Sequence, residues 1–163
     1  DTFIRVGTSG HIQPDSVSGE LAIISAAIRD EGTSIHYLPI AFPALADMEI
    51  VAALRSAAQK AGLPHSLGIS QSKDSFYGEI EPERSGVTSR LLDRWHAWQV
   101  GGAICSEMEA AALFIVASTL KVRAGGIMAM HGEGPFGSLE PLIETAISGV
   151  RELIKADQLS KEL

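Results

Sequence analysis

A chain of 163 residues, 45% of them hydrophobic, is long enough to form one domain with a substantial core. Its 13 basic and 20 acidic residues give a net charge of -7, which argues against binding to nucleic acid or to an anionic membrane. The single cysteine, Cys105, can form no internal disulfide, and no stretch is apolar enough over sufficient length to span a bilayer. We therefore expect one domain over residues 1–163, located in the cytoplasm.

The chain opens with residues 2–6, an apolar segment that predicts a buried strand, and residues 7–10 predict a polar loop at its end. Ligands of α/β sheets commonly bind at such strand ends. Arg5 is unusual within a strand. It either faces water at a sheet edge or holds an oxyanion, assisted by the Thr8 hydroxyl and the loop amides. The neighbouring loop residue His11 is expected to face solvent.

Residues 12–28 are rich in β-formers, although residues 21–28 would also fit a buried helical turn, and we choose a strand. Residues 29–34 predict a polar turn, and residues 35–38 predict a short return strand that Pro39 ends.

Asp47 is expected to cap a helix that Gly62 and Pro64 terminate. Residues 66–70 predict the next strand, and a long loop then runs over residues 73–86. This loop contains aromatic residues, so it is not expected to be a passive linker.

Residues 89–98 predict an amphipathic helix. Residues 103–105 predict the central strand, with Cys105 as a buried packing residue, and residues 110–120 predict a helix against the sheet. Residues 121–123 would close this helix with basic side chains that suit its dipole.

Residues 126–130 predict a buried strand, followed over residues 131–137 by a Gly-rich loop without the spacing of a nucleotide-binding fingerprint. Residues 142–156 predict an amphipathic helix, and residues 157–163 predict a polar, frayed tail. The alternation of strands and helices predicts an α/β fold with a mainly parallel, partly mixed sheet covered on both faces.

Between the central strand and its helix, Ser106-Glu107-Met108-Glu109 places two carboxylates in an apolar stretch. Ser106 and Glu109 have the spacing of a capping box, so Glu109 would only stabilise the helix terminus. Alternatively, these charges bind a ligand rich in hydroxyls, because carboxylates near a core are costly without partners. The residues alone leave both interpretations open.

Three segments together resemble the signature segments of the nucleoside phosphorylases, most of all the uridine phosphorylase branch. They are Arg5-Val6-Gly7-Thr8-Ser9-Gly10, Asp74-Ser75-Phe76-Tyr77-Gly78 and Glu107-Met108-Glu109. The resemblance implies a three-layer sandwich with a mainly parallel, mixed central sheet, incomplete at its N-terminus. Residues 1–163 would form the C-terminal two thirds of the family domain, whose earlier portion carries a Gly-Asp phosphate loop and further phosphate-binding arginines.

The resemblance also implies a nucleoside and inorganic phosphate as substrates, with no metal and no other cofactor. Arg5 and Glu109 would be the catalytic residues. Arg5 and Thr8 would bind phosphate, and Thr8, Met108 and Glu109 would bind ribose. The residues expected to bind the base are Ser9, Gly10, Phe76, Glu79, Arg84 and Glu107. The resemblance further implies that this chain forms a homo-oligomer with sites shared between neighbouring subunits.

The uridine phosphorylases are similar to one another in a Gln and an Arg that follow the Phe and bind uracil. Here Glu79 occupies the expected position of the Gln, and Arg84 is the only arginine of this loop. A carboxylate only accepts hydrogen bonds, whereas an amide also donates. Purine-specific relatives resemble one another in an Asp near the end of the last core strand, and His131 is the nearest proton donor here.

The preferred function is phosphorolytic cleavage of uridine-type nucleosides to free base and ribose 1-phosphate. The alternatives are a purine nucleoside phosphorylase or nucleosidase, and a catalytically silent nucleoside-binding or oligomer-forming fragment.

Overall fold

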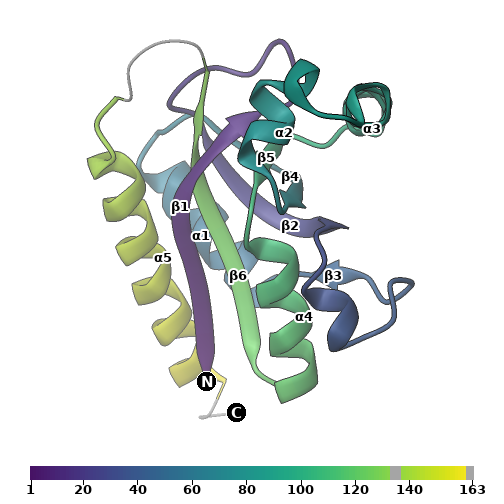
Figure 1. Cartoon of the computed structure of the whole chain (residues 1–163). Coiled ribbons are helices and arrows are strands. Elements are labelled where there is room, and N and C mark those ends of the chain that lie inside the picture. Colours follow the sequence, from purple (N-terminus) through teal and green to yellow (C-terminus); the bar gives the residue numbers. More distant parts are fainter. Residues whose placement is uncertain (133–136, 161–163) are drawn as a thin grey trace.

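The computed structural model describes residues 1–132 and 137–160. This part of the chain contains six strands and five helices, and Figure 1 shows their arrangement. The strands are β1 (Thr2–His11), β2 (Leu21–Asp30), β3 (Ala44–Leu45), β4 (His65–Lys73), β5 (Cys105–Glu107) and β6 (Arg123–His131). The helices are α1 (Met48–Lys60), α2 (Phe76–Ile80), α3 (Thr88–Val100), α4 (Ala110–Leu120) and α5 (Glu140–Leu159), with short 3-10 helices η1 (Ser34–His36) and η2 (Pro82–Arg84).

The sheet is mixed and closes on itself. Its strand order is β3-β2-β4-β5-β1-β6, and β2 also pairs with β6, so five strands form a barrel and β3 extends it. Parallel pairs join β1 to β6, β2 to β4 and β4 to β5, whereas β1–β5, β2–β6 and β2–β3 are antiparallel. The predicted α/β class with a mixed sheet is confirmed. The closure of the described strands into a barrel was not predicted.

The closure depends on the shape of β2. Its first half, Leu21 to Ile24, pairs with β4 on one side and with β6 on the other. The register with β4 then shifts between Ile24 and Ala26. An extra residue of this kind bends a strand and increases its twist, which allows β2 to leave β6 and continue along β4.

Helices cover the barrel on two sides: α1 and α5 pack together on one side, and α4 lies on the other (Figure 1). Glycines allow α1 to approach both β6, at Gly125, and α5, at Gly149. A Cβ at Gly125 would lie 2.4 Å from Ile50 Cγ2, and one at Gly149 would lie 2.7 Å from Leu54 Cδ2. Both contacted side chains are fully buried, so these glycines set how deeply α1 sits in the core.

Several predicted element ends are confirmed by the local geometry. The Asp47 carboxylate accepts hydrogen bonds from the backbone N–H groups of Glu49 and Ile50, at 3.0 and 3.3 Å. Gly62 follows this helix with a φ of +66°. The helix predicted over residues 110–120 has those bounds, and it ends at Lys121 in the left-handed conformation with a φ of 57°.

The strand predicted over residues 35–38 is wrong, because Ser34–His36 form a 3-10 helix instead. Arg29 explains the difference. Its guanidinium donates to the carbonyl oxygens of Leu38, Pro39 and Phe42 at 2.6 to 2.7 Å. The loop thus satisfies its backbone acceptors with a side chain rather than with a neighbouring strand.

Other boundaries also differ from the prediction. Residues 7–10 do not form a loop, because they continue β1 and pair with residues 128–131 of β6. The long loop over residues 73–86 contains α2 and η2. Arg123 begins β6 rather than closing α4, and α5 continues to Leu159. Part of the predicted Gly-rich loop, residues 133–136, and the end of the predicted tail, residues 161–163, lie outside the described residues.

Helix α5 is apolar on two faces, although the sequence predicts one. The face toward the barrel buries Leu142, Ala146 and Leu153. A second apolar stripe is between 40% and 51% exposed; it consists of Ile143, Ile147, Val150 and Ile154. No helix in residues 1–132 and 137–160 combines the length and apolar character needed to cross a membrane.

Candidate functional site

A pocket of about 560 Å³ lies at the ends of β1, β5 and β6 and beside α2. Its size is suitable for a small organic ligand. Nine of the ten residues that the sequence favours for the site line it. They are Arg5, Thr8, Ser9, Gly10, Phe76, Glu79, Glu107, Met108 and Glu109.

Strand pairing brings these distant segments together. Gly10 lies opposite Ser106 in the antiparallel β1–β5 pair and opposite His131 in the parallel β1–β6 pair. Ser72 lies beside Glu107 in the parallel β4–β5 pair. The ends of four strands therefore meet at one edge of the barrel, and polar side chains at these ends face a common space.

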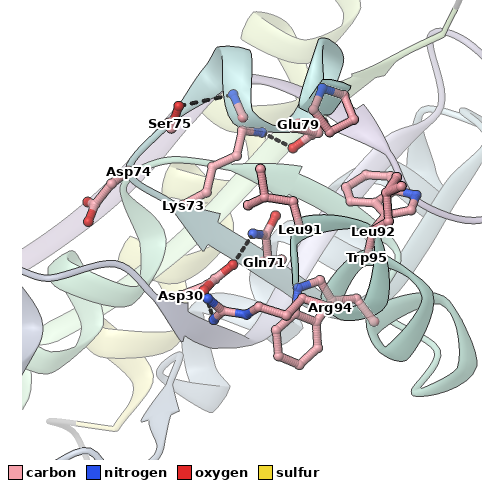
Figure 2. A pocket seen from close by; sticks show the side chains of 13 residues that line it. Asp30, Gln71, Lys73, Asp74, Ser75, Glu79, Leu91, Leu92, Arg94 and Trp95 are labelled. Carbon is pink, nitrogen blue, oxygen red and sulfur yellow. Dashed lines mark hydrogen bonds and ion pairs between the residues drawn. The ribbon is translucent and has the colours of Figure 1, made fainter. Parts of the chain in front are cut away.

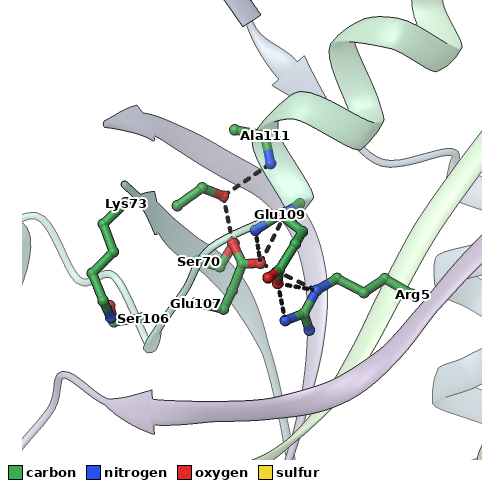
Figure 3. Close-up of polar contacts among 9 residues, drawn as sticks. Arg5, Ser70, Lys73, Ser106, Glu107, Glu109 and Ala111 are labelled. Atoms are coloured by element: carbon green, nitrogen blue, oxygen red, sulfur yellow. Dashed lines mark hydrogen bonds and ion pairs between the residues drawn. The ribbon is translucent and has the colours of Figure 1, made fainter. Parts of the chain in front are cut away.

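Arg5 contacts both carboxylates of the central motif (Figure 3). Its Nε donates to Glu109 Oε2 at 2.8 Å and lies 3.4 Å from Glu107 Oε2, and Nη2 also contacts Glu109. Nη1 is buried and has no hydrogen-bond partner among the described residues. Buried donors are normally paired, so this nitrogen is available to an acceptor from a ligand.

A glycine provides the space for this guanidinium. A Cβ at Gly7 would lie 2.8 Å from Arg5 Nη1 and 3.3 Å from Arg5 Cζ. Such contacts are too close for an unshifted side chain. The glycine two residues after Arg5 is therefore part of the reason that this arginine folds back along its own strand.

Glu107 is fully buried and anchors the start of α4. Its Oε2 accepts from the backbone N–H groups of Glu109 and Ala110, both at 2.8 Å. Its Oε1 accepts from the hydroxyls of Ser70 and Ser72, and the Ser72 hydroxyl accepts from the Ala111 N–H at 2.9 Å (Figure 3). Four donors occupy nearly all the acceptor capacity of a carboxylate. The geometry therefore favours anchoring over direct contact of Glu107 with a ligand.

The capping-box interpretation of Ser106 and Glu109, one of the two that the residues left open, is wrong. Ser106 lies in β5, the helix begins at Ala110, and the Glu109 side chain makes no capping hydrogen bond. Glu107 makes the contacts to the helix terminus instead. The Glu109 side chain is 59% exposed at the pocket, where it pairs with Arg5.

Cys105 is fully buried behind the pocket, as predicted. Burial raises the pKa of its thiol from 9.0 to about 12, and the nearby Glu107 carboxylate adds to the increase. The thiol is therefore neutral near pH 7, which suits packing rather than nucleophilic chemistry.

Sequence reasoning missed Lys73, which lines the same pocket. Its ammonium pairs with the Glu79 carboxylate and donates to the Ser106 hydroxyl at 2.6 Å. The Lys73 and Glu79 side chains are only 8% and 14% exposed. Lys73 Nζ also lies 5.8 Å from the centre of the Phe76 ring, within the range of a cation–π contact. The available sequence signal was a lysine directly before the Asp74-Ser75-Phe76 segment.

The expectation that His11 faces solvent is wrong. It lines the pocket, and its Nδ1 is buried without a hydrogen-bond partner among the described residues. The ring packs against Gly132, where a Cβ would lie 2.8 Å from His11 Cε1. His131 also lines the pocket.

Arg84 is not brought into this pocket. It belongs to η2 and lines a separate surface hollow, with a side chain that is 74% exposed. The neighbouring Glu81, three residues earlier, pairs with it at the surface. The prediction that Arg84 binds the base therefore has no support from the geometry of the pocket.

The chain matches the Phosphorylase superfamily over residues 1–151, and it belongs to this family. Over 131 residues it is 47% identical to the uridine phosphorylase of Treponema pallidum, covering 80% of this chain and 51% of that protein. It is 42% identical over 135 residues to the uridine phosphorylase of Thermococcus kodakarensis, covering 80% and 48%.

A purine nucleoside phosphorylase of Plasmodium falciparum is 32% identical over 164 residues, which cover 93% of this chain and 63% of that protein. The chain thus spans about half the length of the two uridine phosphorylases and somewhat more of the purine enzyme. The family resemblance predicted from the three segments is confirmed.

Proposed function

We propose that the protein carrying this chain cleaves uridine-type nucleosides by phosphorolysis and releases free base and ribose 1-phosphate. The observation that carries the proposal is Arg5, whose buried Nη1 lacks a described partner inside a pocket that also contains Glu109 and Phe76. The similarity to uridine phosphorylases over 80% of the chain supports the same reaction.

In this proposal Arg5 and the Thr8 hydroxyl orient phosphate for attack on the anomeric carbon. A phosphate oxygen forms a bond to this carbon while the glycosidic bond breaks, and the bonding electrons leave with the base. Holding both reactants in one pocket supplies proximity, and the fixed guanidinium balances charge as the bond breaks.

The remaining pocket residues would hold the nucleoside. Glu109 would accept hydrogen bonds from the ribose hydroxyls, because its two oxygens match a pair of adjacent hydroxyls. Met108 would pack on the sugar, and Phe76 would stack on the base beside Ser9 and Gly10. Phe76 and Met108 are exposed at the pocket and available for such contacts.

The charge of the pocket suggests that it is incomplete for phosphate. Its described lining contains the cations Arg5 and Lys73 and the carboxylates Glu79, Glu107 and Glu109. A phosphate dianion would meet net repulsion there, so we propose that further cations come from outside residues 1–163. A neighbouring subunit of a homo-oligomer or another part of the same polypeptide would supply them.

We further propose that residues 1–163 form the C-terminal part of a larger phosphorylase domain with a three-layer arrangement. The exposed apolar stripe of α5 supports this proposal, as do Phe3 and Val6 on β1, which are 50% and 43% exposed. Exposed apolar surface of this kind commonly marks an interface. The buried, unpaired Cys105 is consistent with a reducing compartment, and we propose a cytoplasmic location.

A steady-state assay of the protein expressed from its complete reading frame tests the activity. Uridine is supplied with and without inorganic phosphate, and uracil and ribose 1-phosphate are measured. Equal release of uracil and ribose 1-phosphate, dependent on phosphate, is the expected result. Release of uracil without phosphate would instead identify a nucleosidase, and nucleoside binding without turnover would identify a silent binding domain.

A purine nucleoside is the second candidate substrate. His131 lines the pocket at the end of β6, where it would protonate a purine ring as it leaves. The similarity to the P. falciparum purine nucleoside phosphorylase supports this candidate. Turnover of inosine but not of uridine in the same assay would favour it.

A further inference from the structure

We propose that Lys73 and Glu79 act as a pair that selects bases carrying a lactam edge, in which a ring N–H stands beside a carbonyl. The proposal rests on the nucleoside-cleaving function proposed above. It assigns a specificity role to Lys73 and gives Glu79 a partner that changes what its carboxylate can recognise.

The position of the pair is the first argument. A second pocket, of about 330 Å³, adjoins the first and is lined in part by Leu91, Trp95 and Trp98. Lys73 and Glu79 line both pockets and are the residues that the two linings share. Figure 2 shows the two side chains pointing toward one another, Lys73 from the end of β4 and Glu79 from α2. The ion pair therefore forms a wall of the candidate base site.

The pair is also held in place by a polar network. The Ser106 hydroxyl accepts from Lys73 at 2.6 Å and is within hydrogen-bond distance of both Glu79 Oε2 and Gln71 Oε1. The Gln71 amide in turn donates to Asp30 Oδ2 at 2.7 Å. Groups fixed in this way are preorganised, so they can discriminate between ligands without first being ordered.

The two oxygens of Glu79 have different surroundings. Oε2 contacts Lys73 and Ser106, whereas Oε1 lies toward Gly10, where an added Cβ would be 3.3 Å away. Oε1 has no hydrogen bond within the part of the chain that the structure describes, residues 1–132 and 137–160. One oxygen thus neutralises the ammonium, and the other remains an acceptor beside Gly10 in the larger pocket.

The chemistry of the pair follows from donor and acceptor counts. A lone carboxylate only accepts hydrogen bonds, and its charge would oppose the departure of an anionic base. An ammonium has three donors, so Lys73 and Glu79 together offer what a single amide offers, a donor beside an acceptor. They also cancel each other's charge.

This arrangement matches a lactam edge. In uracil the ring N–H would donate to Glu79, and the adjacent carbonyl would accept from Lys73; the N1–H and O6 of a 6-oxopurine have the same pattern. Cytosine and adenine reverse the pattern, with a ring acceptor beside an amino group. When the bound sugar fixes the position of such a base, the Lys73 donor faces the amino group and the Glu79 acceptor faces the ring acceptor. Neither hydrogen bond can then form, and leaving such groups unpaired is costly.

Two substitutions and their combination test the proposal. In Lys73→Met the ammonium is lost and the length of the side chain is kept. In the double variant Lys73→Met with Glu79→Gln an amide replaces the pair. Lys60→Met is the matched control, because Lys60 makes an exposed ion pair with Glu152 on α5, away from the pocket. For each variant, kcat/KM is measured with uridine and cytidine, together with the midpoint of urea unfolding.

We expect Lys73→Met to lower kcat/KM for uridine by about 10- to 100-fold and to reduce the preference for uridine over cytidine. The double variant should recover most of this loss, because Gln supplies both a donor and an acceptor. An unchanged preference in Lys73→Met, or a double variant no better than the single one, would overturn the proposal even if the unfolding midpoint falls.

Calorimetric binding of free uracil, cytosine and hypoxanthine keeps this test separate from the proposed activity. If the parent protein binds uracil or hypoxanthine more tightly than cytosine and Lys73→Met removes the difference, the pair selects the lactam edge whether or not uridine is cleaved. Equal binding of all three bases by the parent protein would contradict the role of the pair.

Discussion

The two glutamates of the central motif have separable roles, and paired substitutions should reveal them. Glu107→Ala removes a buried acceptor and leaves the backbone donors of Glu109 and Ala110 without their partner. It also leaves Arg5 with one carboxylate. Breaking a buried charge network of this kind costs about 3 to 5 kcal/mol of unfolding free energy. Glu107→Ala should therefore be strongly destabilised.

Glu109→Ala should have the opposite effect. The Glu109 side chain is 59% exposed and makes no capping hydrogen bond, so losing its pair with Arg5 should cost about 0 to 1 kcal/mol of stability. If it binds two ribose hydroxyls, each hydrogen bond to its charge contributes about 1.5 to 3 kcal/mol. The loss in kcat/KM should then be about two to four orders of magnitude.

Urea unfolding followed by circular dichroism and phosphate-dependent cleavage of uridine measure the two effects in the same preparations. Glu109→Gln is the conservative control, because its single carbonyl oxygen should retain part of the activity. An active but clearly destabilised Glu109→Ala would refute the assignment and restore a purely structural role for this residue.

Three further substitutions or conditions test other parts of the structure. Gly7→Ala should displace the Arg5 guanidinium, whose Nη1 would lie 2.8 Å from the new Cβ, and should raise KM for phosphate more than KM for the nucleoside. Equal increases in the two KM values would contradict this prediction. Gly86→Ala is the control, because the added Cβ there meets open space. Asp47→Ala should lower the free energy of unfolding by about 1 kcal/mol, because the helix cap is lost, without changing kcat/KM. An unchanged urea midpoint would show that this cap does not contribute to stability. The raised pKa of Cys105 means that the folded chain retains a thiol proton that the unfolded chain loses, so stability should decline from about pH 9 upward toward pH 12. The limiting slope is about 1.4 kcal/mol per pH unit, and a Cys105→Ala variant with the same decline would refute this origin.

Local sequence signals predicted the parts of the fold that depend on local contacts. Asp47 and Gly62 marked the ends of α1 because capping requires only neighbouring backbone groups. The closure of the barrel was not predictable in this way, because it depends on β2 pairing with both β4 and β6. Likewise, the sequence does not show which donor pairs with the carbonyl oxygens of Leu38, Pro39 and Phe42. In the folded chain the Arg29 guanidinium donates to all three.

The capping box failed for an informative reason. Ser106 and Glu109 have the correct spacing, but spacing does not determine which side of a strand end a side chain faces. Pairing of β5 with β4 places Glu107 beside Ser72, so its carboxylate turns inward toward two serine hydroxyls and the start of α4. The same pairing leaves Glu109 at the pocket, where a ligand can reach it.

The side of the pocket beside α2 was the hardest part to predict, because it depends on one short helix. Ser75 caps α2 by accepting from the Gly78 N–H at 3.0 Å, and this turn brings Glu79 back against the end of β4. Lys73 and Glu79 therefore form an ion pair although they are six positions apart in the sequence. Neither a regular helix nor a single strand brings side chains at this separation into contact. Read as a loop, the segment makes Glu79 an unpaired carboxylate and a poor substitute for an amide. Folded as a capped turn, it gives Glu79 a cation, and the base selection proposed for the pair depends on this contact.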